Sequence, residues 1–405
     1  MSISGLFPCF QPIVETATGR IAGYESLARR RTSDGRIVSA ASLFTDPQVS
    51  TDERVAADRA LRQQAIRWFA QHSAPDTYLS LNISPEWVGY IAGQEILPTL
   101  QMLEEAGLEP SRILIEITEL DGNPEGVLAL VERYREAGMR IALDDFGTGF
   151  SQLDRVASLS PDVIKLDMRF FKNGLSSYQS GAIVEMVGEL GARLGSRIIC
   201  EGIETEEEFF YALSCNASAM QGFFFDAAEA ELIEPQKYSA RVREMLEVYL
   251  GMAREQVGRQ QWHNDKIQTQ LLSIRQQMLM GEEMDWQQTY LPGDQLLRLY
   301  ICDHQGNQIS PNFENKDGCW IADSSQQGHN WAWRPYFYQL LGMDDYQHRM
   351  VSSSSYLDIQ TGERCHTLAL ALDEQRILLA DIRERHLSGS LIPTASCHSV
   401  LLPDL

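Results

Sequence analysis

Several features that define common protein classes are missing from this chain. Its 405 residues include seven cysteines, an odd number, and no two of them form a Cys-X-X-Cys pair. Scattered cysteines of this kind indicate free thiols in a reducing compartment rather than a disulfide framework or a zinc site. No run approaches the roughly 18 apolar residues of a transmembrane helix. The first residues, MSISGLFPCF, lack the basic and apolar regions of a secretory signal. These absences predict a cytoplasmic location.

Positive charge and histidine are also scarce. The 34 lysines and arginines stand against 56 acidic residues, a net charge of −22, and there is no long basic cluster. We therefore expect no non-specific binding to DNA or to an anionic membrane surface. Only one of the eight histidines, His72, precedes residue 236, which excludes a Ser-His triad or a histidine-rich metal site from this part of the chain. An anionic substrate would need metal ions to approach such a protein.

The first ~235 residues alternate short apolar strands with amphipathic helical segments. Strands are expected at Phe7–Val14, Ala22–Ala28, Tyr78–Ser84, Ile113–Thr118, Arg140–Phe146, Val163–Asp167, Arg197–Ile203 and Gln221–Phe225, and helices near 53–72, 94–107, 124–138, 151–159, 180–194 and 205–214. This alternation predicts a parallel sheet with helical crossovers, and about eight strands favour a TIM-like (β/α)8 barrel over an open sheet.

Polar side chains follow the apolar part of these strands. They are Glu25, Asn82, Glu116, Glu119, Asp144, Asp145, Lys165, Asp167, Glu201, Glu204 and Gln221. Buried carboxylates repel one another and cost on the order of several kcal/mol each unless they are neutralised. Hard cations such as Mg²⁺ or Mn²⁺ prefer oxygen ligands. The pattern therefore predicts a metal site at the C-terminal face of the barrel, where such barrels hold their active sites.

Seven short motifs occur in order along the same region. They are YESLAR at 24–29, NIS at 82–84, EITE at 116–119, DDFGTGFS at 144–151, KLD at 165–167, EGIE at 201–204 and QGF at 221–223. In this order, over about residues 6–232, they resemble the EAL family of cyclic di-GMP phosphodiesterases. The signature triplet is Glu-Ser-Leu rather than Glu-Ala-Leu, which should leave the ligand role of Glu25 intact. Ala228 stands where the family usually has proline, and Gln152 where a second serine is common.

The resemblance implies hydrolysis of cyclic di-GMP to linear pGpG by a homodimer with two Mg²⁺ or Mn²⁺ ions, and inhibition by Ca²⁺. One metal would be held by Glu25, Asn82, Glu116 and Asp144, and the second by Asp144, Asp145 and Asp167. Lys165 would orient the attacking water. Glu201 would act as general base or metal ligand, two roles that the sequence does not separate. Glu25, Lys165 and Glu201 are thus the expected catalytic residues.

Further positions are assigned by the same resemblance. Leu27, Arg29 and Gln221 would contact the substrate. Glu119 and Glu204 would hold the loop after Asp145 and couple the site to the dimer interface, and Gly147, Thr148 and Gly149 would give that loop conformational freedom and backbone donors. Taken singly, Arg29 also fits an ordinary surface residue, and Glu119 a helix N-terminal acid. Because every matched ligand position is filled, an active enzyme is favoured; the alternative is a non-catalytic cyclic di-GMP receptor that signals to a partner.

Residues 236–292 have a different pattern, which we interpret as a helical connector after an EAL domain at 1–235. Two apolar stripes have helical spacing: Leu246, Leu250, Ala253 and Val257, then Ile267, Leu271, Ile274 and Met278. Gln260, Gln261 and Asn264 interrupt them. The spacing predicts one or two long amphipathic helices. Such a helix either packs on its own domain or serves as a connector or dimer helix.

Residues 293–390 are rich in strand signals such as LLRLYICD, HTLALAL and RILLADI, and 391–405 form a tail. Around NWAWRPYF at 330–337, this part resembles the PAS/Cache-like domain of YkuI-type EAL proteins. The resemblance implies an α+β sensor domain with a small-molecule pocket walled by Trp331, Trp333, Arg334 and Tyr336, in which Arg334 pairs with a carboxylate or phosphate. Alternatively, the tryptophans are core or interface residues and Arg334 belongs to a structural ion pair.

Overall fold

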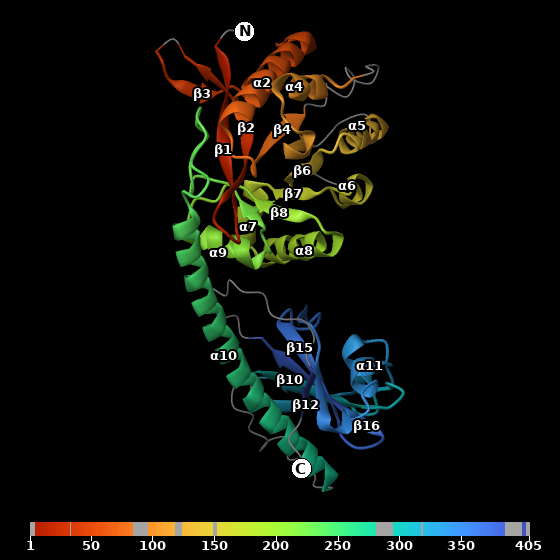
Figure 1. Ribbon diagram of the computed structural model, residues 1–405. Coiled ribbons are helices and arrows are strands. Elements are labelled where there is room, and N and C mark those ends of the chain that lie inside the picture. Colours follow the sequence, from red (N-terminus) through yellow and green to blue (C-terminus); the bar gives the residue numbers. More distant parts are fainter. Residues whose placement is uncertain are drawn as a thin grey trace. The chain divides into compact units, whose positions relative to one another are not determined.

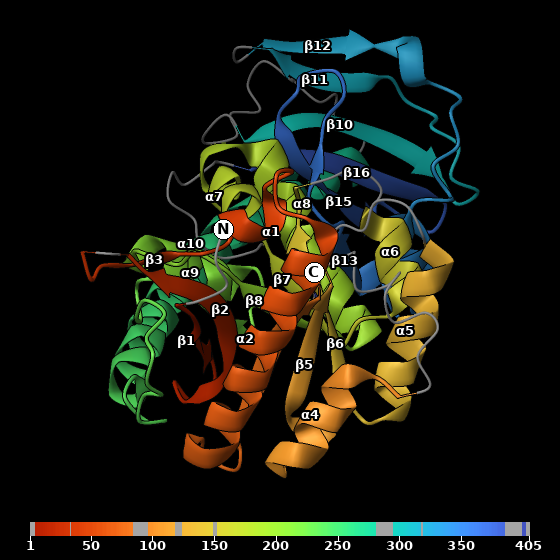
Figure 2. The same cartoon turned by 90° about the horizontal axis from the view of Figure 1, so that it is seen from above.

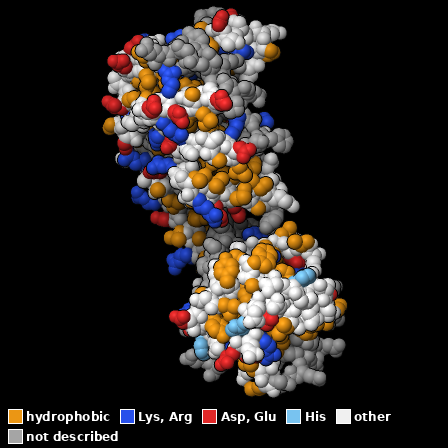
Figure 3. All heavy atoms as spheres, turned by 90° about the vertical axis from the view of Figure 1, so that its right-hand side faces the viewer, with side chains coloured by type: hydrophobic (Ala, Val, Ile, Leu, Met, Phe, Trp, Pro, Cys, Tyr) orange, Lys and Arg blue, Asp and Glu red, His pale blue; other side chains and the backbone are white. Residues whose placement is uncertain are grey.

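The computed structural model describes residues 5–32, 34–83, 96–117, 124–148, 152–280, 295–316, 319–384 and 399–401. The chain forms two compact units, Met1–Gly251 and Met252–Leu405. Within the described ranges, no helix combines the length and the apolarity needed to cross a bilayer. Acidic and basic side chains are intermixed on the face of the first unit that Figure 3 presents.

The first unit is a closed barrel (Figures 1 and 2). Its strands are β1 (Leu6–Glu15), β2 (Ile21–Arg31), β3 (Ile37–Ser39), β4 (Tyr78–Ile83), β5 (Ile113–Ile117), β6 (Arg140–Phe146), β7 (Val163–Leu166), β8 (Arg197–Cys200) and β9 (Ala219–Met220). The order β1-β9-β8-β7-β6-β5-β4-β2 closes because β1 also pairs with β2, and β3 extends the edge of β2. The predicted TIM-like barrel is confirmed.

The barrel is mixed rather than fully parallel, because β1 runs antiparallel to both of its neighbours, β2 and β9. Only residues 16–20 separate β1 from β2. That stretch is long enough for a hairpin but too short for the helical crossover that a parallel pair requires. The strand predicted at 7–14 is therefore present but has the opposite direction to that of a βα repeat.

The helices of the first unit lie outside the strands, as α2, α4 and α5 show in Figure 2. They are α1 (Ser42–Thr45), α2 (Thr51–His72), α4 (Pro98–Ala106), α5 (Pro124–Glu136), α6 (Gln152–Leu159), α7 (Met168–Ser176), α8 (Tyr178–Leu194) and α9 (Glu206–Ser214). A short 3-10 helix spans Pro110–Arg112. Helix α7 was not predicted. It begins directly after Asp167, whose carboxylate accepts hydrogen bonds from the first free amides of the helix.

The strand predicted at 221–225 is wrong. The strand is β9, and Gln221 follows its end. Beyond β9 the backbone turns at Gly222, which has φ +156°. The turn is hydrogen-bonded to the segment after β8, because the Ile203 amide donates to the Gln221 carbonyl and the Phe224 amide donates to the Ile203 carbonyl. A Cβ at position 222 would lie 2.1 Å from the Ile203 carbonyl oxygen, so glycine is required there.

Helix α10 (Ser239–Leu279) is one continuous helix of 41 residues. The glutamines that interrupt the apolar stripes do not break it, because glutamine is itself a good helix former. In the second unit, Ile267, Leu271 and Ile274 pack against the sheet. Leu250 and Val257, by contrast, are 58% and 48% exposed. The interpretation that this helix packs on its own domain is therefore correct only for its second apolar stripe.

The second unit is an antiparallel sheet of order β12-β11-β10-β16-β15-β13-β17, with β14 paired to β15. The strands are β10 (Leu296–Asp303), β11 (Asn312–Lys316), β12 (Cys319–Asp323), β13 (Arg349–Ser352), β14 (Tyr356–Leu357), β15 (Arg364–Ala371), β16 (Arg376–Arg383) and β17 (Ser399–Leu401). One core cluster joins the sheet to α10 and another joins it to α11 (Pro335–Leu341). This confirms the α+β domain; the residue boundaries proposed from the sequence stay predictions.

Candidate active site

The side chains inside the barrel form layers. An apolar layer comes first along the strands, and a polar layer follows it toward their C-terminal ends. One core cluster contains Leu114, Ala142, Val163, Ile199 and Ala219, one from each of β5 to β9. Side chains two residues apart on a strand point to the same face. The next inward residues are therefore Glu116, Asp144, Lys165, Glu201 and Gln221. Strand periodicity alone thus brings these five polar groups into one layer at the end of the barrel.

Lys165 is the centre of this layer. Its ammonium nitrogen lies 2.7 Å from Glu116 Oε1 and Glu201 Oε1, 3.1 Å from Asp144 Oδ1 and 3.4 Å from Glu25 Oε2. Its side chain is 1% exposed. Burial by itself would lower the pKa of Lys165, but the surrounding carboxylates outweigh it and raise that pKa well above its usual value. One buried cation thus faces four carboxylates.

The carboxylates respond to this crowding in different ways. Burial, followed by the charge of Glu25, raises the pKa of Glu116 well above its usual range. Burial likewise raises the pKa of Glu201 to about 8 and, together with the Asp144 charge, that of Asp145 to about 6. Burial would also raise the pKa of Glu25, but Lys165 and the Gln221 and Asn82 amides lower it. Fully ionised, these carboxylates would carry more negative charge than Lys165 alone can balance.

A divalent cation fits this imbalance. Oxygens of Asp144, Asp145 and Glu201 lie within 4.8 Å of one another. Within the described part of the chain, Glu116 Oε2 and Gln221 Oε1 are buried without a hydrogen-bond partner. Buried oxygens rarely stay unpaired, and carboxylate and amide oxygens are ligands that Mg²⁺ and Mn²⁺ accept. The donor set is therefore chemically suited to hard cations.

The backbone at Asp144 and Asp145 departs from regular strand geometry, which changes the direction of these two side chains. The pairing of β6 with β7 shifts register between Leu143 and Phe146, and Asp145 has a positive φ of 52°. Bulges and left-handed non-glycine residues concentrate at functional sites, where the surrounding structure maintains them. Thr148 stabilises the turn, because its amide and hydroxyl both donate to the Asp145 carbonyl.

A cavity of about 720 Å³ opens above this layer. It is lined by Glu25, Leu27, Arg29, Asp144, Asp145, Asp167, Glu201, Glu204 and Gln221, among others. Asn82 donates to Glu25 Oε1 at 2.9 Å and so joins the same network. Glu204 also forms an ion pair with Lys172 at 3.0 Å. The structure therefore brings these predicted residues together; Glu119 and Gly149 lie outside the described residues.

Two contributors to the layer were not predicted. The Ser80 hydroxyl donates to Glu116 Oε1 at 2.6 Å, and Gln11 Oε1 accepts from Gln221 Nε2 at 3.1 Å. Ser80 had a signal, because it precedes Asn82 by two residues and so shares its face. Gln11 precedes the core residue Ile13 by two residues. Its place in the polar layer depends on the antiparallel direction of β1, which the sequence does not show.

The pocket predicted in the second unit is also present, with one correction. A cavity of about 490 Å³ is lined by Trp331, Arg334 and Tyr336. Trp333 is not part of the lining. Its ring is 64% exposed and packs against the Arg334 guanidinium, whose carbon lies 4.2 Å from the ring centroid.

Comparison with known proteins agrees with this architecture. The model of the EAL domain family matches residues 2–228, and that of the EAL-domain associated signalling protein domain matches residues 232–390. The chain is 25% identical over 389 residues to the uncharacterized EAL-domain containing protein YkuI of Bacillus subtilis, covering 94% of this chain and 95% of that protein. The crystal structure of YkuI with cyclic di-GMP and calcium covers 95% of this chain and 98% of that chain at 24% identity, with a TM-score of 0.85.

A relative with a named activity matches about half of this chain. A cyclic di-GMP phosphodiesterase of Pseudomonas aeruginosa is 29% identical over 221 residues, which cover 54% of this chain and 38% of that protein.

Proposed function

The chain belongs to the EAL domain family, and from that premise we propose that it hydrolyses cyclic di-GMP to linear pGpG with two Mg²⁺ or Mn²⁺ ions. The family matches confirm the resemblance seen in the sequence, for both parts of the chain. The observation that supports the proposal most directly is the buried polar layer, in which Lys165 contacts four carboxylates beneath an open cavity. A solved relative holds cyclic di-GMP together with calcium.

The residues that would hold the two cations follow from the donor set. Asp144, Asp145 and Glu201 are close enough to share one ion. Glu25, Asn82 and Glu116 belong to the same network around Lys165, and Asp167 lines the same cavity. Bound divalent cations would neutralise phosphate charge and lower the pKa of a bound water. Calcium accepts looser geometry than Mg²⁺ does, and we expect it to support binding but to inhibit turnover.

The remaining roles belong to the side chains of the protein. The Lys165 ammonium holds the Glu116 and Glu201 carboxylates in place and is positioned to orient a water. With the cations bound, Glu201 would serve either as an ion ligand or as the general base that accepts a proton from that water, and its contact with Lys165 through Oε1 is compatible with both roles. The Arg29 guanidinium and the exposed Phe223 ring line the cavity. They provide a cation for a phosphate and a flat surface for a guanine base.

The proposal also covers assembly and regulation. We expect a cytoplasmic homodimer whose turnover responds to the domain that follows α10. Size-exclusion chromatography with light scattering tests the oligomeric state, and turnover measured with and without a ligand of the second unit tests the regulation.

The decisive experiment is turnover of cyclic di-GMP by the full chain in Mg²⁺, Mn²⁺, Ca²⁺ or EDTA, with chromatography for pGpG. We expect product only with Mg²⁺ or Mn²⁺. Glu25→Gln should reduce the rate about 100-fold or more, because the oxygen that pairs with Lys165 and Gln221 loses its charge. Glu189→Gln is the matched control, since Glu189 is an exposed residue of α8. Tight binding without product in any metal would instead indicate a receptor.

A further inference from the structure

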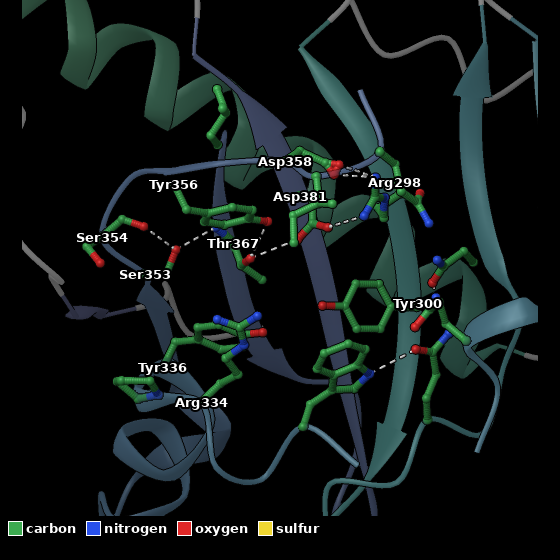
Figure 4. A pocket seen from close by; sticks show the side chains of 18 residues that line it. Arg298, Tyr300, Arg334, Tyr336, Ser353, Ser354, Tyr356, Asp358, Thr367 and Asp381 are labelled. Atoms are coloured by element: carbon green, nitrogen blue, oxygen red, sulfur yellow. Dashed lines mark hydrogen bonds and ion pairs between the residues drawn. The ribbon is translucent and has the colours of Figure 1, made fainter. Parts of the chain in front are cut away.

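The cavity of the second unit has the properties of a small-molecule site. Its volume of about 490 Å³ falls within the range of roughly 300–1,000 Å³ that such sites occupy. The lining comes from β10, β14, β15, β16 and the segment that leads into α11 (Figure 4). Tyr300, Trp331, Tyr336 and Tyr356 place aromatic rings in it. Leu357 and Ile359 line it too while exposed, so they form an apolar rim.

Below these rings lies a buried polar floor in which one arginine contacts two carboxylates. Arg298 donates to both oxygens of Asp358, at 2.8 and 2.7 Å, and its other terminal nitrogen lies 3.5 Å from Asp381 Oδ2. The Thr367 hydroxyl donates to Asp381 Oδ1 at 2.8 Å and lies 3.0 Å from the Tyr356 hydroxyl. These contacts hold the groups in place and so shape the cavity, with two carboxylates to one guanidinium.

Arg334 is different. Arg334 is exposed, and among the described residues no carboxylate forms an ion pair with its side chain, whose guanidinium carbon lies 6.0 and 4.2 Å from the ring centroids of Trp331 and Trp333. Figure 4 shows its guanidinium directed into the cavity beside Tyr336. Arginine offers a planar set of donors that matches a carboxylate with two parallel hydrogen bonds. Of the described residues that line the cavity, Arg334 therefore supplies a cation without a carboxylate partner, flanked by aromatic surface.

We propose that this cavity binds a small organic carboxylate, with the carboxylate on Arg334 and an apolar body against the aromatic rings. The charge of the lining favours a monoanion over a phosphate, because Asp358 and Asp381 would repel a second negative charge. The apolar rim favours a ligand with a hydrocarbon part over a bare inorganic anion. This inference concerns the second unit alone and does not depend on the proposed phosphodiesterase activity.

The test is calorimetric titration of the purified full chain with propionate, hexanoate and phenylacetate, each compared with its neutral amide, and with inorganic phosphate. We expect at least one carboxylate to bind once per chain, with its amide about 10- to 100-fold weaker, as the loss of a charge-assisted hydrogen bond predicts. Phosphate should bind more weakly than that carboxylate.

Three variants locate the site. Arg334→Gln should weaken carboxylate binding about 10- to 100-fold. Arg376→Gln is the matched control, because Arg376 belongs to the same unit, pairs with Asp373 and does not line the cavity. Arg29→Gln tests the barrel cavity and should leave the affinity unchanged. The proposal is overturned if none of the three carboxylates binds at up to about 10 mM, if the amides bind equally well, if phosphate is preferred, or if Arg334→Gln has no effect.

Discussion

Replacing Lys165 with methionine removes the one ammonium in the described polar layer of the barrel while keeping a side chain of similar length. The nitrogen contacts four carboxylates at 2.7–3.4 Å and is almost fully buried. Without it, Glu25, Glu116, Asp144 and Glu201 face one another in a medium that screens charge poorly. They must either take up protons or repel one another, and both responses destabilise the folded metal-free protein at neutral pH.

The expected loss can be bounded. Removing one partner of a buried ion pair costs about 3–5 kcal/mol. For a unit the size of Met1–Gly251, each kcal/mol lowers Tm by about 2–4 °C. The transition of the barrel in EDTA should therefore fall by roughly 6–20 °C. Turnover in Mg²⁺ should fall by about 100- to 10,000-fold, since the group that orients the water is lost.

Differential scanning calorimetry in EDTA and in Ca²⁺ measures the effect, with Lys237→Met as the matched control. Lys237 is 47% exposed and pairs with Asp226 at the surface, so its loss should cost about 0–1 kcal/mol. Calcium should stabilise Lys165→Met more than it stabilises the parent, because the cation supplies part of the missing positive charge. A Tm for Lys165→Met within about 2 °C of the parent in EDTA would refute this account of the layer.

Three further predictions concern pH, packing and backbone conformation. Between about pH 5 and 8, folded Glu201, with a pKa of about 8 against a usual 4.5, holds a proton that the unfolded chain has lost. The free energy of unfolding of the metal-free protein should therefore fall as pH rises across this window, and Ca²⁺ should stabilise the protein more at pH 8 than at pH 5.5. A free energy of unfolding that does not change with pH, measured by urea unfolding in EDTA, would contradict this. Leu271→Ala should destabilise the second unit by about 2–5 kcal/mol in urea unfolding, because Leu271 is buried between α10 and the sheet. Leu250 is exposed, so the control variant Leu250→Ala should change the free energy of unfolding by less than about 0.5 kcal/mol. Gly147→Ala should reduce turnover about tenfold or more, because a Cβ at φ +112° would lie 2.1 Å from Phe170 Cγ, next to Asp145. Gly251→Ala, in open space on α10, should leave the rate unchanged, and equal rates for the two variants would show that the loop tolerates the added atom.

The sequence determined the barrel and most of its polar layer, because both follow from local periodicity. Alternating strands and helices predict the fold, and a polar residue two positions after an inward apolar one predicts a place in the layer, as for Glu116 and Asp144. The same signal was present in the second unit, where Arg298 and Asp381 interrupt apolar strands and line the cavity. The resemblance to a PAS/Cache-like domain predicts only Trp331, Arg334 and Tyr336 of this lining.

Contacts between distant segments were decided only by the tertiary structure. Lys165 reaches Glu25 across 140 residues, and Gln221 reaches Gln11 across 210, because closure of the barrel brings β1 beside both β9 and β2. The direction of β1, the place of Asp167 as the N-cap of α7, and the exposure of Trp333 depend in the same way on neighbours that no local pattern specifies. Periodicity determines which face a side chain occupies, but strand order and direction determine what it meets there.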